Sequence, residues 1–409
     1  MSSAQTFAYT SRDAGGKLVK GKMEAQSESV VVTRLRTMGL SPVTIGSAGA
    51  GTGLNREINL GGFTKGVKPK DLAVVTRQMA TMVAAGLSLL RTLAIISEQT
   101  ENKTLAQVFT TVRGDVEAGK SLSDAMGKHT REFPPLMLNL IRAGEVGGFL
   151  EGALESVANN FEAEVKLTGQ IKAALSYPIV VLVIAIISVA AMLIFIVPVF
   201  EKMFAQMGAK LPLPTQFLVD LSHGMVFIGP IVVVGGIALA IWWKKSKNEL
   251  KVRRVVDPLR LRMPVFGELM KKVAIARVTR NLATMVGSGV PILRALQVVG
   301  ATSGNWVIES ALTRAGEAVR NGSTIAEPLA KEKVFPSMVT QMIAVGEDSG
   351  ALETMLHKVS DFYDQEVESM TEQLTALIEP IMIAVIGVLI GGMIVALYMP
   401  IFDIYGHIH

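Results

Sequence analysis

The sequence predicts a mostly α-helical membrane protein with three transmembrane helices, two repeated cytoplasmic six-helix bundles and a small N-terminal α+β module. Two observations carry this prediction. Half of the 409 residues are hydrophobic, only 18% are charged and the mean hydropathy is +0.42, whereas soluble domains contain about 25% charged residues. The second half of the chain also repeats the first. This composition excludes a disordered or fibrous protein, and the lack of cysteine excludes a disulfide scaffold, a Cys-ligated zinc site and a Cys nucleophile.

The first 45 residues differ from the rest of the chain and predict the α+β module. Strands are expected at Phe7–Tyr9, Leu18–Met23 and Pro42–Ile45, and a helix at Ser27–Thr37. Residues 46–66 are rich in Gly, Ser and Thr, which is typical of a flexible linker.

Three runs of 19 residues without a charge predict membrane spans, at 179–197, 225–243 and 381–399. At 1.5 Å rise per residue each run covers about 28 Å, close to the hydrocarbon thickness of a bilayer. The spans contain no ionisable residue, so they show no sign of a proton relay or an ion path.

Lysine and arginine are unevenly distributed around the spans. Eight of the twenty residues from 244 to 263 are basic, whereas the loop 198–224 contains only Lys202 and Lys210. By the positive-inside rule the basic cluster lies in the cytoplasm and the loop outside. We therefore expect a multi-pass protein of the cytoplasmic (inner) membrane, with its N-terminus and both repeats in the cytoplasm and residues 400–409 outside.

The basic juxtamembrane segment 244–269 has two interpretations. In the first, its basic side chains bind anionic lipid head groups, with a binding free energy of ~1 kcal/mol per basic residue near the surface. In the second, the segment only determines the topology of the chain in the membrane. Because this segment accounts for the pI of 9.2 and the net charge of +5, we do not expect a nucleic-acid partner.

The internal repeat is the central feature of the sequence. Arg77–Asn102 and Arg280–Asn305 are identical at ten of 26 positions, at an offset of 203. At an offset of 202, Phe133-Pro134 matches Phe335-Pro336, and Ala143–Leu150 matches Val345–Leu352. Apolar residues at helical spacing, with breaks at glycine and proline, predict about six short helices in each copy.

The predicted boundaries are 1–45 (N-terminal module), 46–66 (linker), 67–178 (first repeat), 179–197 (first span), 198–224 (external loop), 225–243 (second span), 244–269 (basic segment), 270–380 (second repeat), 381–399 (third span) and 400–409 (external tail).

One stretch imitates a nucleotide-binding motif. Gly114–Ser121 fits the P-loop pattern, whose backbone N–H groups and lysine would hold phosphates. A P-loop follows a strand, however, and Leu105–Ala118 predicts a helix that ends at Gly119. The corresponding stretch of the second copy, Glu317–Thr324, lacks the lysine. We therefore expect no nucleotide site here.

Among the histidines only His407 and His409 are close in sequence, and we expect no metal, no cofactor and no catalytic residue.

The remaining motifs point to interactions. Gly387 and Gly391 form a GxxxG pattern in the third span. The pattern is interpreted as a helix dimerisation face, with simple flexibility or packing within the chain as the alternatives. The acidic stretch 361–379 is either a solvated helix face or a docking surface for a basic partner. Glu145 and Glu347 are expected as turn and helix-start residues, where a carboxylate favours a helix N-terminus; a partner contact or a bound cation is the alternative.

Together these residues resemble the inner-membrane platform proteins of type IV pilus and type II secretion machines, PilC and GspF. The resemblance covers essentially the whole chain, and Lys68–Ala73 favours the pilus branch. Its motifs are Phe7-Ala8-Tyr9 with Gly15 and Gly21, Leu35–Pro42, Arg77–Met82 with Gly86, Gly289-Val290-Pro291 and the doubled Gly-Glu-x-x-Gly-x-Leu turns. Ser88 departs from the pattern, because the second copy has Pro291 there and the family often has proline.

The resemblance implies a non-enzymatic platform that forms a homo-dimer or higher oligomer in the lipid membrane. Its implied partners are a cytoplasmic hexameric assembly ATPase, pilin or pseudopilin subunits and other inner-membrane assembly proteins. The candidate partner-interface residues are Arg91, Gly144, Glu145, Arg294, Gly346 and Glu347. A type II secretion platform is the alternative, and a transporter subunit or a membrane-tethered lipid or nucleic-acid binder is more distant.

Overall fold

The computed structural model describes residues 5–12, 18–25, 28–47, 66–206, 211–247, 249–264 and 266–407. The chain divides into two compact units, Met1–Thr64 and Lys65–His409, which are described separately. The predicted linker at 46–66 lies almost entirely outside the described residues.

The first unit is a small sheet with one helix. Strand β1 (Gln5–Arg12) lies between β2 (Leu18–Ala25) and β3 (Ser41–Ser47), and both pairings are antiparallel. Helix α1 (Glu28–Thr37) buries Val31 and Leu35 against Phe7 and Ala25. These four side chains form the core of the unit.

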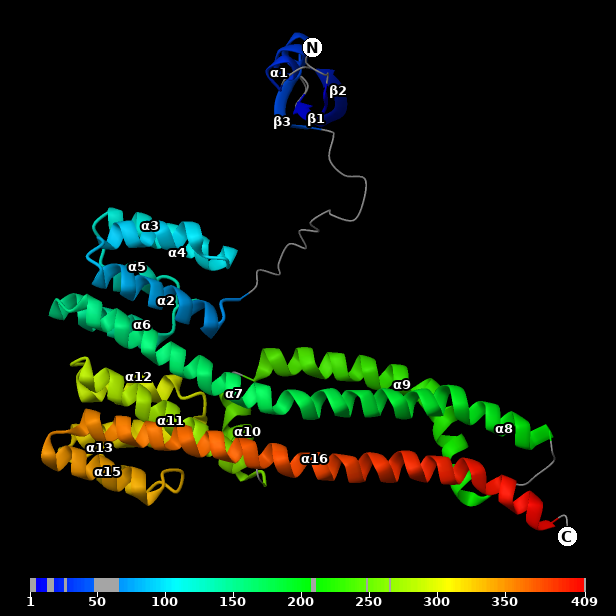
Figure 1. Cartoon of the computed structure of the whole chain (residues 1–409). Coiled ribbons are helices and arrows are strands. Elements are labelled where there is room, and N and C mark those ends of the chain that lie inside the picture. The colour runs from blue at the N-terminus through cyan, green and yellow to red at the C-terminus, as the bar shows by residue number, and fades with distance from the viewer. Residues whose placement is uncertain are drawn as a thin grey trace. The chain divides into compact units, whose positions relative to one another are not determined.

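The second unit is mostly helical (Figure 1) and its helices form two equivalent series. The first series is α2 (Pro69–Ala84), α3 (Leu89–Gln99), α4 (Lys103–Glu117), α5 (Leu122–Gly127), α6 (Pro135–Gly147) and α7 (Leu150–Ala191). The second series is α11 (Phe266–Gly287), α12 (Ile292–Thr302), α13 (Trp306–Arg320), α14 (Ala326–Ala330), α15 (Ser337–Ser349) and α16 (Leu352–His407). Short polar caps start several of these helices: the Ser88 side chain accepts from the N–H of Arg91, and the Asn102 side chain from that of Leu105.

The same ion pair joins the first and last helices of each series. Arg77 of α2 binds Glu162 of α7 at 2.7 Å, and Arg280 of α11 binds Asp364 of α16. The hydrogen bond from Arg77 holds the pKa of Glu162 below its usual range. The acidic stretch 361–379 is thus partly neutralised within the chain, because Lys272 also binds Glu366 at 2.8 Å.

Within the described residues, three helices are long and apolar enough to span a membrane, which agrees with the three predicted spans. The first continues from α7 through a π-helical turn (Met192–Ile196) into α8 (Val197–Gln206); the others are α9 (Leu213–Ser246) and α16. Pro178 and Pro380 lie inside α7 and α16 without ending them. Much of the predicted external loop is also helical, because α8 and the start of α9 pack their apolar side chains on α16.

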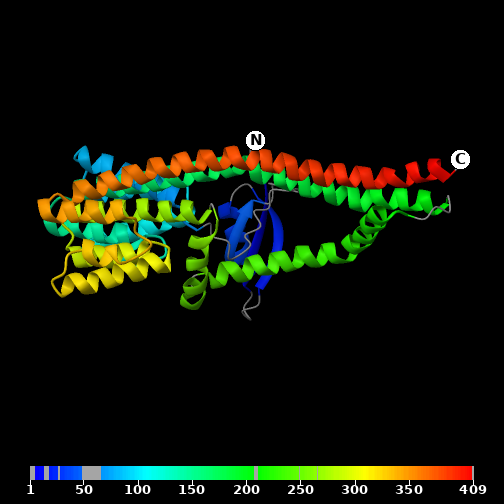
Figure 2. The same ribbon diagram turned by 90° about the horizontal axis from the view of Figure 1, so that it is seen from below.

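The three spanning helices pack unequally. Helices α7 and α16 run side by side (Figures 1 and 2). Helix α9 is joined to them near the end away from the repeats, where Thr215 donates to the carbonyl of Ala396 and Ser222 to that of Leu193, both at 2.5 Å. Figure 2 shows α9 diverging from that junction, and its apolar membrane window is 0% buried within the described chain.

The two repeats share one continuous hydrophobic core and meet at a polar junction. The buried Asn160 side chain of α7 donates to Asn281 of α11 at 2.8 Å. One helical turn further along α7, Glu164 accepts a 2.9 Å hydrogen bond from Arg277 Nε. Below them, toward the membrane, Leu167 of α7 packs with residues of α11 and α16. The relative position of the repeats is therefore fixed by both apolar contact and paired polar groups.

Replacing Asn160 by alanine should weaken this junction, because it leaves the buried amide of Asn281 without its partner. We expect Asn160→Ala to lower the free energy of unfolding by about 1–3 kcal/mol, measured as a lower Tm of the full chain in detergent. The double variant Asn160→Leu/Asn281→Leu removes both polar groups and should regain most of the loss. An equal loss in both variants would contradict this account of the junction.

Candidate functional site

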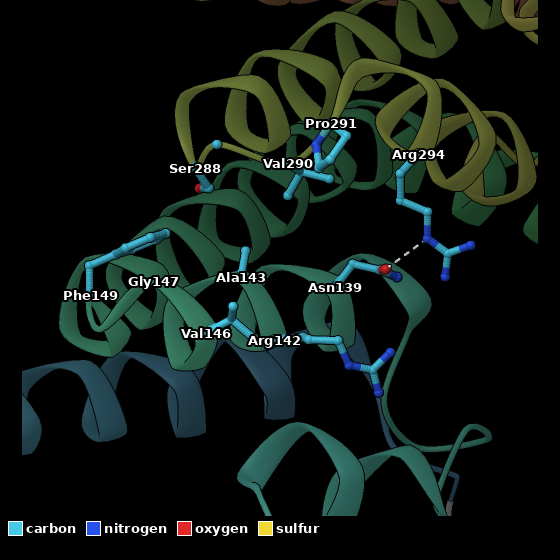
Figure 3. Close-up of a pocket in the computed structure, with 11 residues that line it drawn as sticks. Asn139, Arg142, Ala143, Val146, Gly147, Phe149, Ser288, Val290, Pro291 and Arg294 are labelled. Carbon is cyan, nitrogen blue, oxygen red and sulfur yellow. Dashed lines mark hydrogen bonds between the residues drawn. The ribbon is translucent and has the colours of Figure 1, made fainter. Parts of the chain in front are cut away.

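A groove opens between the two repeats, on one side of their junction (Figure 3). Its volume is about 550 Å3, and it lies between α6 and the turn that connects α11 to α12. Its walls are formed by Asn139, Arg142, Ala143, Val146, Gly147, Phe149, Ser288, Gly289, Val290, Pro291 and Arg294. The groove therefore exists only where residues more than 130 positions apart in the sequence come together.

Local sequence explains the shape of both walls. Pro134 precedes the first residue of α6 and Pro291 precedes that of α12, where proline suits the start of a helix. Gly289 adopts a φ of +71°, a conformation that residues with a side chain rarely adopt, and so allows the tight turn between α11 and α12. Across the groove, Arg294 Nε donates to the Asn139 side chain at 3.1 Å.

The groove combines positive charge with exposed apolar surface. Arg294 bonds to the amide oxygens of Asn139 and Gln297, so these contacts leave its charge uncompensated. Arg142 forms an ion pair with Asp124 at 2.9 Å in which both side chains are more than half exposed. Val146 is 86% exposed and Phe149 41%. Such a surface suits a segment that carries a carboxylate beside an apolar side chain.

The doubled Gly-Glu motif has the same internal role in both repeats. Glu145 lies in α6, and its carboxylate accepts from the N–H groups of Leu122 and Ser123 at the start of α5. Glu347 lies in α15 and accepts from Ile325 at 2.6 Å and from Ala326 at 2.9 Å. The expectation that these glutamates lie in turns is wrong, since both are inside helices. Each carboxylate does contact a helix N-terminus, as expected, but it is the N-terminus of the preceding short helix, α5 for Glu145 and α14 for Glu347.

The glycines of the motif allow close helix packing. A Cβ at Gly144 would overlap the Cβ of Ala153 in α7, and one at Gly346 would lie 2.8 Å from Cα of Leu352 in α16. The turns follow three or more residues later, at Gly148 and Gly350, with φ of +74° and +68°. Gly144, Glu145, Gly346 and Glu347 thus hold each repeat together, and their contact with a partner stays a prediction.

The structure brings only part of the predicted interface set together. Arg294 lines the groove, and Gly144 and Glu145 lie on the helix that forms its other wall. Arg91, exposed on α3, and the pair on α15 belong to other surfaces. Sequence reasoning missed Asn139, Arg142, Val146 and Phe149. Of these, only Val146 and Phe149 stood in a recognised motif, and nothing in the sequence indicated that they meet α12.

The P-loop-like stretch contains the end of α4, as predicted, and also Ser121, the N-cap residue of α5. Helix α4 ends at Glu117 and Gly119 adopts a φ of +89°. Lys120 binds Asp115 at 2.7 Å, and the hydrogen bonds from Lys120 and Lys128 lower the pKa of Asp115. The lysine is therefore engaged by a carboxylate near the end of its own helix. In the described stretch before it, helices α3 and α4 stand where a P-loop would follow a strand.

The basic juxtamembrane segment is partly occupied within the chain. It contains α10 (Leu250–Arg262), which lies against α13. Arg253 binds Glu309 at 2.8 Å, and the guanidinium carbon of Arg254 lies 5.8 Å from the ring centre of Trp306. The Asp257 carboxylate accepts a hydrogen bond from the backbone N–H of Trp306. Several of the basic side chains thus fasten the segment to the second repeat, which neither of its two sequence interpretations included.

The GxxxG glycines show no packing role inside the chain. A Cβ built at Gly387 or at Gly391 would meet no atom within 4 Å in the described structure. Of the three interpretations of this motif, packing within the chain therefore loses its support, while dimerisation and simple flexibility stay predictions.

Removing the Glu145 carboxylate should destabilise the first repeat, because two N–H groups at the start of α5 lose their acceptor. For Glu145→Ala, and equally for Glu347→Ala at α14, we expect a loss of about 1–3 kcal/mol, measured as a lower Tm and faster proteolysis of the purified full chain. Glu98→Ala, which removes an exposed carboxylate on α3, is the matched control. If it lowers the Tm as much, the capping account fails.

Comparison with known proteins accounts for the duplication and for the first unit. The family model described as type II secretion system (T2SS), protein F, matches twice, at residues 75–198 and 278–400. The model of the N-terminal domain of type II secretion system protein F matches residues 1–46.

Similar proteins span nearly the whole chain. Type IV pilus assembly protein PilC of Myxococcus xanthus is 41% identical over 404 residues, covering 98% of this chain and 95% of that protein. PilC of Thermus thermophilus is 39% identical, with 98% of each chain covered. Type II secretion system protein F of Vibrio cholerae is 32% identical and covers 97% of this chain and 98% of its own. The chain therefore belongs to the family of type II secretion system protein F and type IV pilus assembly protein PilC.

Proposed function

We propose that this chain is the inner-membrane platform of a type IV pilus assembly machine. In this role it is a non-enzymatic scaffold that couples a cytoplasmic hexameric assembly ATPase to the insertion of pilin subunits into the fibre. The observation that carries the proposal is its 41% identity, over almost the whole chain, to a type IV pilus assembly protein. A type II secretion platform that drives pseudopilus assembly and protein export is the second candidate, favoured by the 32% identity to protein F of Vibrio cholerae.

The orientation proposed for the chain follows from its charges. The basic segment 244–269, the N-terminal α+β module and the two six-helix bundles, 67–178 and 270–380, face the cytoplasm, and the tail 400–409 faces outward. The cytoplasmic bundles are then accessible to an ATPase, and the spans are accessible to pilin subunits in the bilayer.

Two continuous helices give this scaffold a means of transmitting force. Leu150–Gln206 is a helical run of 57 residues and α16 has 56, so each is about 85 Å long. Each begins inside a repeat and continues through a predicted span. Because each run is continuous from a repeat into a span, a displacement of a bundle would be carried along the same helix into the membrane. ATPase-driven displacement of the bundles would thus move the spans and lift each subunit by one step.

The groove between the repeats is the proposed contact for the ATPase. Its exposed Arg294 and Arg142 fit acidic groups, and Val146 and Phe149 fit an apolar side chain beside them. Since both repeats form its walls, a partner seated in the groove would act on both bundles at once.

Reversing the charge of Arg294 should weaken this contact. We expect Arg294→Glu to lower capture of the assembly ATPase by about tenfold, equivalent to ~1.4 kcal/mol, and to reduce the number of surface pili. The measurement is co-purification from solubilised membranes together with pilus counts. Arg131→Glu, at an exposed arginine outside the groove, is the control. Unchanged capture by Arg294→Glu would place the contact elsewhere.

Deletion of the chain distinguishes the two candidate functions. If it is the pilus platform, cells without it lose surface pili while their secreted enzymes still reach the medium. The measurements are electron microscopy of pili and activity assays on the culture supernatant. Intact pili together with lost secretion would instead establish the type II secretion role.

A further inference from the structure

The two repeats meet through different faces. The contact pairs are Asn139 with Arg294, Asn160 with Asn281, and Glu164 with Arg277. The first repeat thus contributes its α6/α7 face, the surface around the first member of each pair. The second contributes its α11/α12 face, the surface around the second member. Such a contact is heterologous, and it leaves one face of each repeat uncovered by the other.

The internal repeat identifies the two uncovered faces. On the α15/α16 face of the second repeat, the equivalents of Asn139, Asn160 and Glu164 are Gln341, Phe362 and Glu366. On the α2/α3 face of the first repeat, the equivalents of Arg294, Asn281 and Arg277 are Arg91, Gln78 and Val74. Figure 1 shows α3 and α15 toward opposite ends of the helical part, with α6 and α12 between them.

Both uncovered faces expose large apolar side chains. Val74 is 49% and Leu90 40% exposed on the α2/α3 face, and Val345 is 53% and Phe362 43% exposed on the α15/α16 face. By contrast Asn160, the equivalent of Phe362 at the junction, is only 7% exposed. Phe362 is thus a large apolar side chain exposed at a position whose equivalent in the other repeat is buried in a contact. Such exposed apolar surface indicates a face that another molecule covers.

The two faces also complement each other in polar chemistry. Arg91 and Gln341 provide the same guanidinium and amide as Arg294 and Asn139, which are hydrogen-bonded at the junction. The α2/α3 face adds the exposed Lys70, and the α15/α16 face adds Glu366, whose side chain is 40% exposed. Each face therefore offers apolar side chains together with polar groups that can bond to those of the other, although Glu366 is also bound to Lys272 of its own chain.

We propose that a second copy of this chain docks its α15/α16 face on the α2/α3 face of the first, reusing between molecules the contact that joins the two repeats within one. This interaction surface is independent of the proposed role in pilus assembly. A heterologous contact either closes into a ring or continues as a filament. Because every copy is anchored by its spans in one bilayer, the contact joins copies that lie side by side in one layer.

The lack of cysteine in the chain makes the contact directly testable by disulfide formation. Gln78 and Phe362 are the equivalents of Asn281 and Asn160, whose side chains are hydrogen-bonded at 2.8 Å, so the proposed contact brings cysteines at these two positions close together. A full chain with Gln78→Cys and a differently tagged full chain with Phe362→Cys are co-expressed and their membranes are oxidised. We expect a disulfide-linked dimer that carries both tags.

Two controls decide between this contact and others. Gln107→Cys, an exposed glutamine on α4, replaces Gln78→Cys and should give no mixed-tag dimer. Each single variant expressed alone should give none either, because a heterologous contact does not bring the same position of two copies together. An absent mixed-tag dimer, an equal yield with Gln107→Cys, or a dimer of one single variant would each overturn the proposal.

A second measurement uses the cysteine-free chain. Arg91→Glu should convert the purified oligomer to monomer in detergent, measured by light scattering, because a carboxylate replaces the guanidinium that donates to Gln341 and cannot itself donate. Adding Gln341→Arg should restore the oligomer. An oligomer that Arg91→Glu leaves intact, or a monomer that Gln341→Arg does not rescue, would refute the contact.

Discussion

The packing of α7 against α11 and α16 is the interaction on which the rest of the second unit depends. Each of these helices carries the core of a repeat, and α7 and α16 also carry a span. The buried Asn160–Asn281 hydrogen bond and the Glu164–Arg277 ion pair give the contact a single register, because a shift along the helix would bury these polar groups without partners. The groove, the shared core and the parallel course of two spans all follow from that register.

Within each repeat, the Gly-Glu motif supplies the corresponding local constraint. The glycine brings α6 against α7 and α15 against α16 at close range, and the glutamate beside it satisfies the first N–H groups of the short helix that precedes. Helices of five or six residues have little stability of their own. A side chain from a longer helix holds them in place, which explains why both copies contain the same two residues at this point.

The sequence was sufficient for the features that depend on local composition. Charge-free runs predicted the three spans, and Gly119 marked the end of α4 because a left-handed glycine is a local requirement. The repeat and the family followed from residue identities alone. Glu145 and Glu347 were misplaced because glycine suggested a turn, whereas here it serves close packing within a helix. The groove was not predictable, since Asn139 and Arg294 meet only through the register of two distant helices.

Helix α9 packs little against the rest of the chain in its membrane window, and this affects which substitutions the helix can accept. Its membrane window makes no buried contact with the rest of the described chain, so its placement in the bilayer depends on transfer of apolar side chains into lipid rather than on fitted packing. Exchanges among Val, Ile, Leu and Phe there alter neither a cavity nor a neighbour. Within the chain, α9 is therefore constrained by hydropathy more than by fitted packing, whereas α7 and α16 are constrained by the shape of each other's surface.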